Sequence, residues 1–285
     1  MCRDYIQSSP GFSGISGGIG LCYTLPMTQY PLSRQSILAA LRQVFEPLPH
    51  VYAMWEGGAA AFDRVDEWSD IDLQVDVEDE QVDEVMALAG QVLAGLSPVE
   101  LEFALPQPTW HGHAQTFFWL RDAGPYLLVD FVVMKHSNPV KFLEQEVHGN
   151  RVVHFDKLGV TDVAPLNAVE FSDQIRRRWE ILRVNFPLFQ SLTMKEIKRG
   201  NAIEAHAFYQ GFTLRPLLEA LRMELTPYHY NFHTRYVYYE LPPEIVQRLE
   251  SLFFIASVDD LAEKRQQAEA WFREIAPRLD EKFSK

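Results

Sequence analysis

Three aspartates in this chain, on two predicted neighbouring strands, are candidate ligands of a divalent metal ion. Asp70 and Asp72 alternate in the segment Ser69-Asp70-Ile71-Asp72-Leu73, and strand residues two apart point to the same face. Asp130 is the lone charge in the apolar run of residues 126–134, which predicts a buried strand. A charge buried without a partner costs several kcal/mol, so Asp130 requires a compensating group. Carboxylate oxygens are the ligands that Mg²⁺ prefers, and Mg²⁺ is one such group.

Two adjacent glycines precede the aspartates and could allow a phosphate to approach the backbone. Gly57 and Gly58 have no Cβ atoms, so a phosphate can approach the backbone and its N–H donors there. Two Mg²⁺ ions roughly 3.5–4 Å apart can neutralise a triphosphate and align an attacking hydroxyl with the leaving pyrophosphate. The glycines and the aspartates together predict a nucleotide site.

These features occur in the order that is typical of the DNA polymerase β-type nucleotidyltransferase superfamily, which the sequence resembles. Gly57-Gly58 is followed by eleven residues, then by Asp70-Ile71-Asp72, and later by Asp130 on an apolar strand. The size of the chain and its helical second half resemble the small bacterial enzymes that adenylylate aminoglycoside or lincosamide antibiotics. The resemblance in the catalytic motifs covers about residues 50–135.

The resemblance implies a role for each of these residues. Asp70 and Asp72 would bind two Mg²⁺ ions, and Asp130 would bind the catalytic ion and help to activate the acceptor. ATP or another nucleoside triphosphate would be the substrate. The nucleotide-binding residues would be Gly57, Gly58, Ser69 and Arg235. Many members have Ser where this chain has Gly58, so a phosphate contact at this position must involve the backbone.

Other interpretations of these residues stay open. Asp130 could instead form an ordinary ion pair with Arg64 or Arg121. His111 and His113 suggest a metal site or a general base, although loop histidines are usually solvated. Glu102 is expected to be an acceptor-side base or an exposed strand residue. Phosphatases and glycosyltransferases with Asp-x-Asp motifs are disfavoured, because their pair follows an apolar strand, whereas here the polar residues 66–69 precede it.

The patterning predicts an α+β fold, in which a mixed sheet with flanking helices is followed by a helical bundle. Alternation predicts strands at residues 51–55, around the aspartates, and at 99–105, 114–120 and 126–134. Helical periodicity predicts helices from Ser33, over the segment that carries Val82 to Leu93, and at 168–187, 202–224, 243–254 and 258–283, the last with a kink at Pro277. The predicted domains are a flexible Gly/Ser-rich leader (1–26), a nucleotidyltransferase catalytic domain (27–160) and an acceptor-binding helical bundle (161–285).

Composition limits the kinds of partner. The chain has 285 residues, 47% of them hydrophobic, and no apolar run long enough to span a membrane, so we expect a cytoplasmic protein. Cys2 and Cys22 indicate neither disulfides nor zinc. The net charge is −13, and residues 27–160 hold 20 acidic against 8 basic side chains. Nucleic acid is therefore an unlikely partner. The acidic charge suits divalent cations and small cationic acceptors, or serves solubility.

The leading hypothesis is a Mg²⁺-dependent nucleotidyltransferase that moves a nucleoside monophosphate, AMP from ATP, to a hydroxyl of a small acceptor. The alternatives are the same chemistry on a protein side chain, as in a toxin–antitoxin-like system, and a catalytically silent nucleotide-binding module. The aromatic stretch at residues 228–236 is a candidate for the acceptor side of the cleft. A homodimer is compatible with a helical half of this kind.

Overall fold

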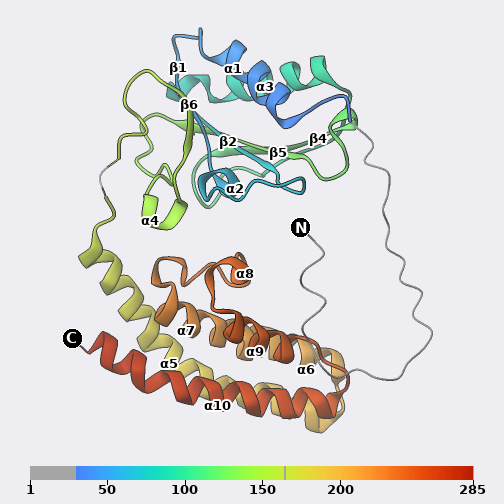
Figure 1. Cartoon of the computed structure of the whole chain (residues 1–285), viewed down its shortest axis with the longest axis vertical. Helices are drawn as coiled ribbons and strands as arrows, with labels where there is room; N and C mark the ends of the chain where they lie inside the picture. The colour runs from blue at the N-terminus through green and yellow to red at the C-terminus, as the bar shows by residue number, and fades with distance from the viewer. Residues whose placement is uncertain (1–29, 164, 285) are drawn as a thin grey trace.

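The computed structural model describes residues 30–163 and 165–284, and the predicted leader and both cysteines lie outside this range. The first half forms a six-stranded mixed sheet with helices on both faces, and the second half forms a layer of packed helices (Figure 1). This confirms the predicted fold class. The domain boundary at 160/161 stays a prediction; in the structure, that position lies between the last strand and the first long helix.

The strand order in the sheet is β3-β4-β5-β2-β1-β6. The strands are β1 (Val51–Glu56), β2 (Ile71–Val77), β3 (Val99–Ala104), β4 (Ala114–Leu120), β5 (Leu128–Lys135) and β6 (Val152–Asp156). β2 and β5 pair in parallel, whereas the other neighbours are antiparallel. The central strands are β2 and β5, and these carry two of the predicted aspartates.

Two helices, α1 (Arg34–Phe45) and α3 (Val82–Leu96), cover the face of the sheet that points away from the second half (Figure 1). Ser33 begins α1 with a capping box that it forms with Ser36. Phe45 of α1 stacks on Phe131 of β5 with ring centroids 5.8 Å apart, and both side chains are fully buried. This main core fixes the central strands in register.

The other face of the sheet points toward the helical half and is covered only in part. Two single-turn helices, α2 (Gly58–Ala61) and α4 (Gln145–His148), lie on this side (Figure 1). A small cluster around Trp55 and Met134 packs beneath them. The face therefore stays open beyond this cluster, which is where the aspartates lie.

The second half is built on two long helices, α5 (Ala168–Arg199) and α10 (Val258–Phe283). Between them lie α6 (Ala202–Tyr209), a π-helical turn (Gln210–Leu214), α7 (Arg215–Leu225), α8 (Val237–Glu240) and α9 (Pro243–Phe253). Short 3₁₀ helices occur at Asp79–Gln81, Arg121–Ala123 and Pro227–His229. Phe186 and Phe272 stack in the core of this half, 3.8 Å apart and 6° from parallel.

The predicted end of the first long helix at residue 187 was wrong, because α5 continues through Pro187 to Arg199. A proline inside a helix removes one backbone donor and leaves a carbonyl without its partner. Pro187 lies on the exposed side of α5, where water can bond to that carbonyl. The same holds for Pro277 within α10, which is also exposed.

Gln190 of α5 supplies a donor that another proline removes. Pro216 has no N–H for the carbonyl of Phe212 in the preceding turn. The side-chain amide of buried Gln190 donates to that carbonyl at 2.9 Å and to the carbonyl of Phe186 at 3.0 Å. Thr213 donates its hydroxyl to Gln190 Oε1 at 2.8 Å. This side chain thus satisfies the irregular π-helical turn from the neighbouring helix.

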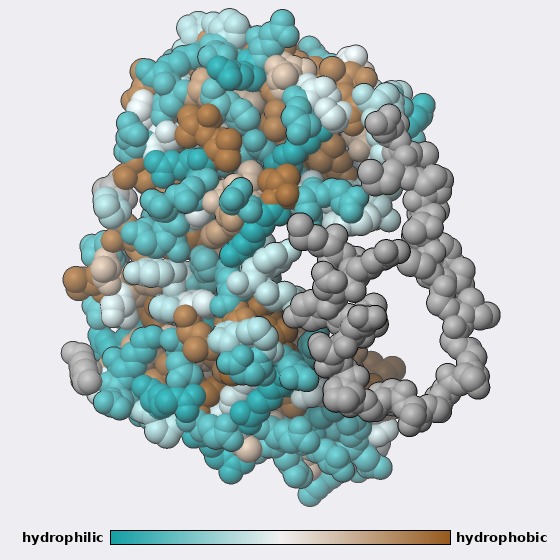
Figure 2. Space-filling view, viewed as in Figure 1, coloured by the Kyte–Doolittle hydropathy of each residue, from teal (hydrophilic) through white to brown (hydrophobic). Residues whose placement is uncertain are grey.

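Polar and charged residues cover most of the face shown in Figure 2, with separate hydrophobic patches in both halves. Within the described residues, no helix is both long and apolar enough to cross a membrane.

Candidate active site

The strand register brings Asp72 and Asp130 side by side. In the parallel β2–β5 pair, Asp72 is the direct partner of Asp130. The alternation predicted Asp70 within the strand. In the structure, β2 begins one residue later, at Ile71, so Asp70 lies just before it. Its side chain is more exposed than those of the other two aspartates. The structure thus pairs Asp72 with Asp130, whereas the three-aspartate site stays a prediction.

The glycine turn closes tightly over Asp72. Gly58 has a φ of +52°, and a Cβ atom on it would lie 1.7 Å from Asp72 Oδ2. Gly57 donates its N–H to the backbone carbonyl of Asp72 at 2.9 Å, and the N–H of Ala59 bonds to the carboxylate. Only glycine allows this approach. By contrast, the hydroxyl of Ser69 donates to Asp66 Oδ1 at 2.7 Å within its own loop.

Asp130 is half-buried and has a neutral partner rather than a cationic one. The side-chain amide of Gln115 donates to both of its carboxylate oxygens, at 2.7 and 2.9 Å. The predicted alternative, an ion pair with Arg64 or Arg121, is wrong, since these pair with Glu240 and Glu100. Sequence reasoning missed Gln115, one of two polar residues in the predicted strand 114–120.

The pKa values of the three aspartates are all raised. Burial, together with the charges of Asp72 and Asp70, raises the pKa of Asp130 from 3.8 to about 6, although the bond from Gln115 opposes the shift. Burial and the charge of Asp70 raise the pKa of Asp72, and burial raises that of Asp70. The carboxylates therefore repel one another, and a bound cation would relieve this repulsion.

The donor set fits a hard divalent cation by chemistry and by strand placement. All three groups are carboxylates, and Asp72 and Asp130 share one edge of the open face. Residues 30–163 and 165–284 contain no group of three acidic, histidine or cysteine side chains already arranged to hold a metal ion. Binding would require Asp130 to turn from Gln115 and Asp70 to approach the pair.

Arg34, which sequence reasoning missed, supports the aspartates from the start of α1. Its guanidinium donates to the backbone carbonyl of Asp70 at 2.5 Å and also bonds to Glu56. Glu56 is buried and bonds to His154 Nε2 at 3.0 Å. Burial raises the pKa values of Asp70 and Asp72, and the positive charge of Arg34 partly offsets this rise. Its position directly after a helix-capping serine gave no signal of this contact.

Arg235, the predicted triphosphate contact, comes from the helical half and is near enough to Asp72 for its charge to act on that carboxylate. Its charge lowers the pKa of Asp72, and the charge of Asp72 raises that of neighbouring Tyr236, whose largest shift comes from burial. Arg235 is exposed, and its guanidinium lies 5.6 Å from the centre of the Phe232 ring. Tyr236 has a left-handed backbone with φ of 61°. Both halves thus contribute to the surroundings of Asp72.

The structure does not bring Glu102 to the cluster. Glu102 pairs with Phe118, which in turn pairs with Val129, whereas Asp130 pairs with Phe117. Directly paired residues share a face, so Glu102 lies on the opposite side of the sheet from Asp130. Its side chain is exposed on the edge strand β3, the second of its two predicted states.

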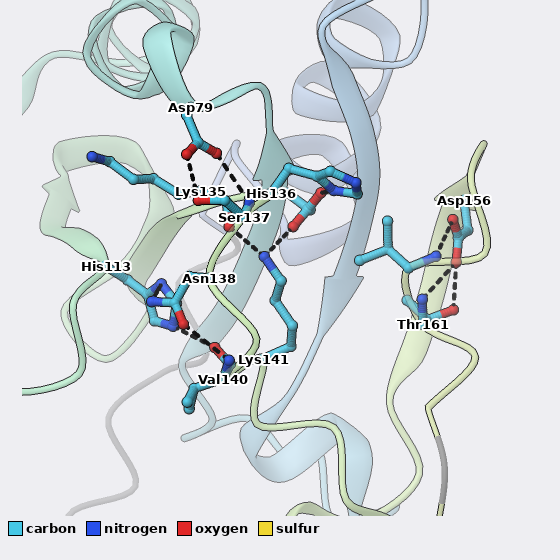
Figure 3. Close-up of polar contacts among 12 residues, drawn as sticks. Asp79, His113, Lys135, His136, Ser137, Asn138, Val140, Lys141, Asp156 and Thr161 are labelled. Carbon is cyan, nitrogen blue, oxygen red and sulfur yellow. Dashed lines mark hydrogen bonds and ion pairs between the residues drawn. The ribbon is translucent and has the colours of Figure 1, made fainter.

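The two histidines are part of the structure around Gln115 rather than free loop residues. His111 Nε2 lies 3.1 Å from Gln115 Oε1. His113 is buried, and its Nε2 donates to the carbonyl of Val140 at 2.7 Å (Figure 3). Burial lowers the pKa of His113. This neutral imidazole fixes the loop after β5, and His111 fixes the amide that contacts Asp130.

Comparisons with known proteins find similarity in architecture only. No family model and no curated protein matches the sequence. An aminoglycoside 6-adenyltransferase from Bacillus subtilis superposes with a TM-score of 0.39 and 11% identity, over 87% of this chain and 90% of that chain. A spectinomycin adenyltransferase from Enterococcus faecialis, solved with ATP and spectinomycin, gives 0.33 and 11%, over 88% and 99%.

Proposed function

We propose that the chain is a Mg²⁺-dependent nucleotidyltransferase that moves AMP from ATP to a hydroxyl of a small acceptor. The observation that carries this proposal is the pair of Asp72 and Asp130 on adjacent parallel strands, closed over by Gly58. The raised pKa values of these carboxylates indicate a charge that a cation would balance.

Each residue has a distinct part in this proposal. Bound Mg²⁺ supplies neutralisation of the triphosphate and alignment of the reacting oxygens. Asp70, Asp72 and Asp130 would hold it, and Asp130, with a pKa of about 6, can accept a proton or hydrogen bond from the acceptor hydroxyl. Gly58 keeps the backbone close to the phosphates. Arg235 provides positive charge opposite Asp72, which suits a triphosphate.

The acceptor is proposed to be small and cationic. The excess of acidic side chains in residues 27–160, 20 against 8 basic, attracts such molecules. Aminoglycosides and lincosamides are the acceptors that the sequence resemblance implies, and they are the first to be assayed. The acceptor would bind on the open face of the sheet, between it and the helices.

A transfer assay with α-labelled triphosphates, Mg²⁺ and pools of antibiotics and cell proteins tests the proposal. We expect label on a small molecule with the wild-type chain, and loss of transfer in Asp72→Asn. Asp79→Asn is the matched control, because Asp79 follows the other end of β2 and bonds to Ser137 there (Figure 3). Label on proteins would mean that the acceptor is a protein side chain rather than a small molecule. Undiminished transfer in Asp72→Asn would refute the metal site.

A further inference from the structure

A carboxylate of the helical half, Glu240, links this half to the part of the chain that carries the aspartates. Its side chain is almost fully buried at 6% exposure and receives bonds from both halves. Arg222 of α7 donates to it at 2.6 Å, and Arg64, which follows α2 in the sheet half, donates at 3.3 Å. Burial alone would raise the pKa of Glu240, but the bond from Arg222 and the charge of His229 bring it below its ordinary value. Glu240 is therefore a charged link between the halves.

On the sheet side, the link leads directly to Asp72. Arg64 donates its backbone N–H to the carbonyl of Ala59 at 2.9 Å, and the N–H of Ala59 bonds to the carboxylate of Asp72. The Arg64 guanidinium also lies about 5 Å from three aromatic ring centres, at 5.0 Å from Phe62, 4.9 Å from Tyr236 and 5.0 Å from Tyr239. Two of these rings come from the helical half, so Arg64 is held by it on several sides.

On the helical side, the link leads to Arg235. Arg222 is fully buried, and besides Glu240 it bonds to the backbone carbonyl of His233 at 2.8 Å and to that of Arg235. The backbone of His233 and Tyr236 is left-handed, with φ of 54° and 61°. Residues other than glycine avoid this backbone conformation unless their surroundings impose it. The bonds from Arg222 hold the backbone of this segment, which carries Arg235, and the charge of Arg235 acts on Asp72.

We propose that Arg64, Glu240 and Arg222 form an interdomain clamp that positions Arg235 and Tyr236 opposite Asp72. These three are positioning residues, since none of them needs to touch the nucleotide. His229 adds a second contact across the halves, with Nδ1 3.1 Å from Glu240 and Nε2 3.1 Å from the carbonyl of Val147. Without the clamp, Asp72 would keep its strand and its glycine turn but lose the opposing positive charge.

Arg64→Met tests the clamp, because it breaks the link between the halves and leaves the bond between Arg222 and Glu240 intact. The nucleotide part of the inference rests on the proposed function. We expect the Kd and KM for Mg·ATP to rise about tenfold or more, with a smaller change in kcat. Arg64→Lys should restore part of the affinity, since it keeps the charge but not the planar stacking. Arg121→Met is the matched control, because Arg121 forms an exposed ion pair with Glu100.

Hydrogen exchange gives a readout that does not depend on nucleotide. In Arg64→Met, the amides of residues 229–240 should exchange faster, whereas those of β2 and β5 should not change. Mg·ATP affinity within about twofold of wild type, together with unchanged exchange, overturns the clamp. If the wild-type chain binds no Mg·ATP, the proposed function fails, and the exchange of residues 229–240 alone then decides whether the clamp exists.

Discussion

Two aspartates in the same sheet have opposite surroundings, and the difference identifies the residue available for chemistry. Asp76, at the far end of β2, is fully buried and bonds to Lys141 at 2.5 Å and to His136 at 2.7 Å. Among the described residues, Asp130 receives side-chain bonds from the neutral amide of Gln115 alone. The acid bonded to lysine is structural, whereas the other retains capacity to bind a cation.

Asp130→Asn should make the metal-free protein more stable at neutral pH while it abolishes transfer. The pKa of Asp130 is higher in the folded chain than its ordinary value of 3.8. Its carboxyl therefore favours the folded state fully at pH values below 3.8, and this stabilisation is lost as the pH rises through about 6. The variant should therefore exceed wild type by about 1–3 kcal/mol at pH 8 and by little at pH 4. Urea unfolding in the presence of a chelator measures both.

Asp79→Asn is the opposite control for this pH dependence. Bonds from Ser137 lower the pKa of Asp79, so this variant should lose stability at pH 8 relative to wild type. Added Mg²⁺ should stabilise wild type and leave Asp130→Asn unchanged. A stability difference for Asp130→Asn that does not vary between pH 4 and 8 would show that its carboxyl is not strained in the fold.

Gly58→Ala should abolish activity, whereas Gly57→Ala should retain much of it. The added Cβ at Gly58 would lie 1.7 Å from Asp72 Oδ2, and the backbone there is left-handed. At Gly57, the nearest atom would be Gln74 Oε1 at 3.2 Å, the end of a flexible side chain. Mg·ATP affinity and turnover of the two variants check this. Equal loss in both would mean that the turn itself, rather than Asp72, limits activity.

At the scale of elements, the sequence predicted those that depend on local pattern. The strands and helices with clear periodicity were found. The structure pairs Asp72 with Asp130, and a site that also includes Asp70 stays a prediction. β6 was missed, as were the roles of Arg34 and Gln115. Their contacts join segments that are distant in sequence, and no local spacing encodes them. The predicted helix end at Pro187 was wrong, because the rule that proline ends a helix does not account for a proline on the exposed face of a helix.

Gln190→Leu should destabilise the helical half by about 1–3 kcal/mol, because it leaves the carbonyl of Phe212 without a donor. No backbone group replaces it, since Pro216 lacks an N–H. Gln266→Leu, on the exposed side of α10, should change stability by less than about 0.5 kcal/mol. Thermal unfolding of the two variants compares them. A Gln190→Leu variant as stable as Gln266→Leu would show that the π-helical turn needs no support from α5.

At the scale of the whole molecule, each half of the described chain has its own main core. One core lies between the sheet and its covering helices, and the other lies among the helices of the second half. Contacts between the halves gather around Glu240 and His229, which are polar. Interfaces of this kind permit relative motion unless a ligand joins the parts.

Binding of Mg·ATP should therefore couple the unfolding of the two halves. Calorimetry of the wild-type chain should show two overlapping transitions without ligand, and one at higher temperature with it. A ligand at about a hundredfold its Kd adds roughly 2.7 kcal/mol to the stability of the state that binds it. Asp72→Asn should show no such change. A single transition in the absence of ligand would mean that the interface already couples the two cores.

The parallel pairing of β2 and β5 also determines when the site can exist during synthesis. Parallel neighbours require a long crossover, which here contains α3, β3 and β4. Asp72 leaves the ribosome well before Asp130, and neither has its partner until β5 has entered the sheet. Nascent chains that end before β5 should therefore have no affinity for divalent ions, and the appearance of that affinity would mark the moment at which the sheet closes.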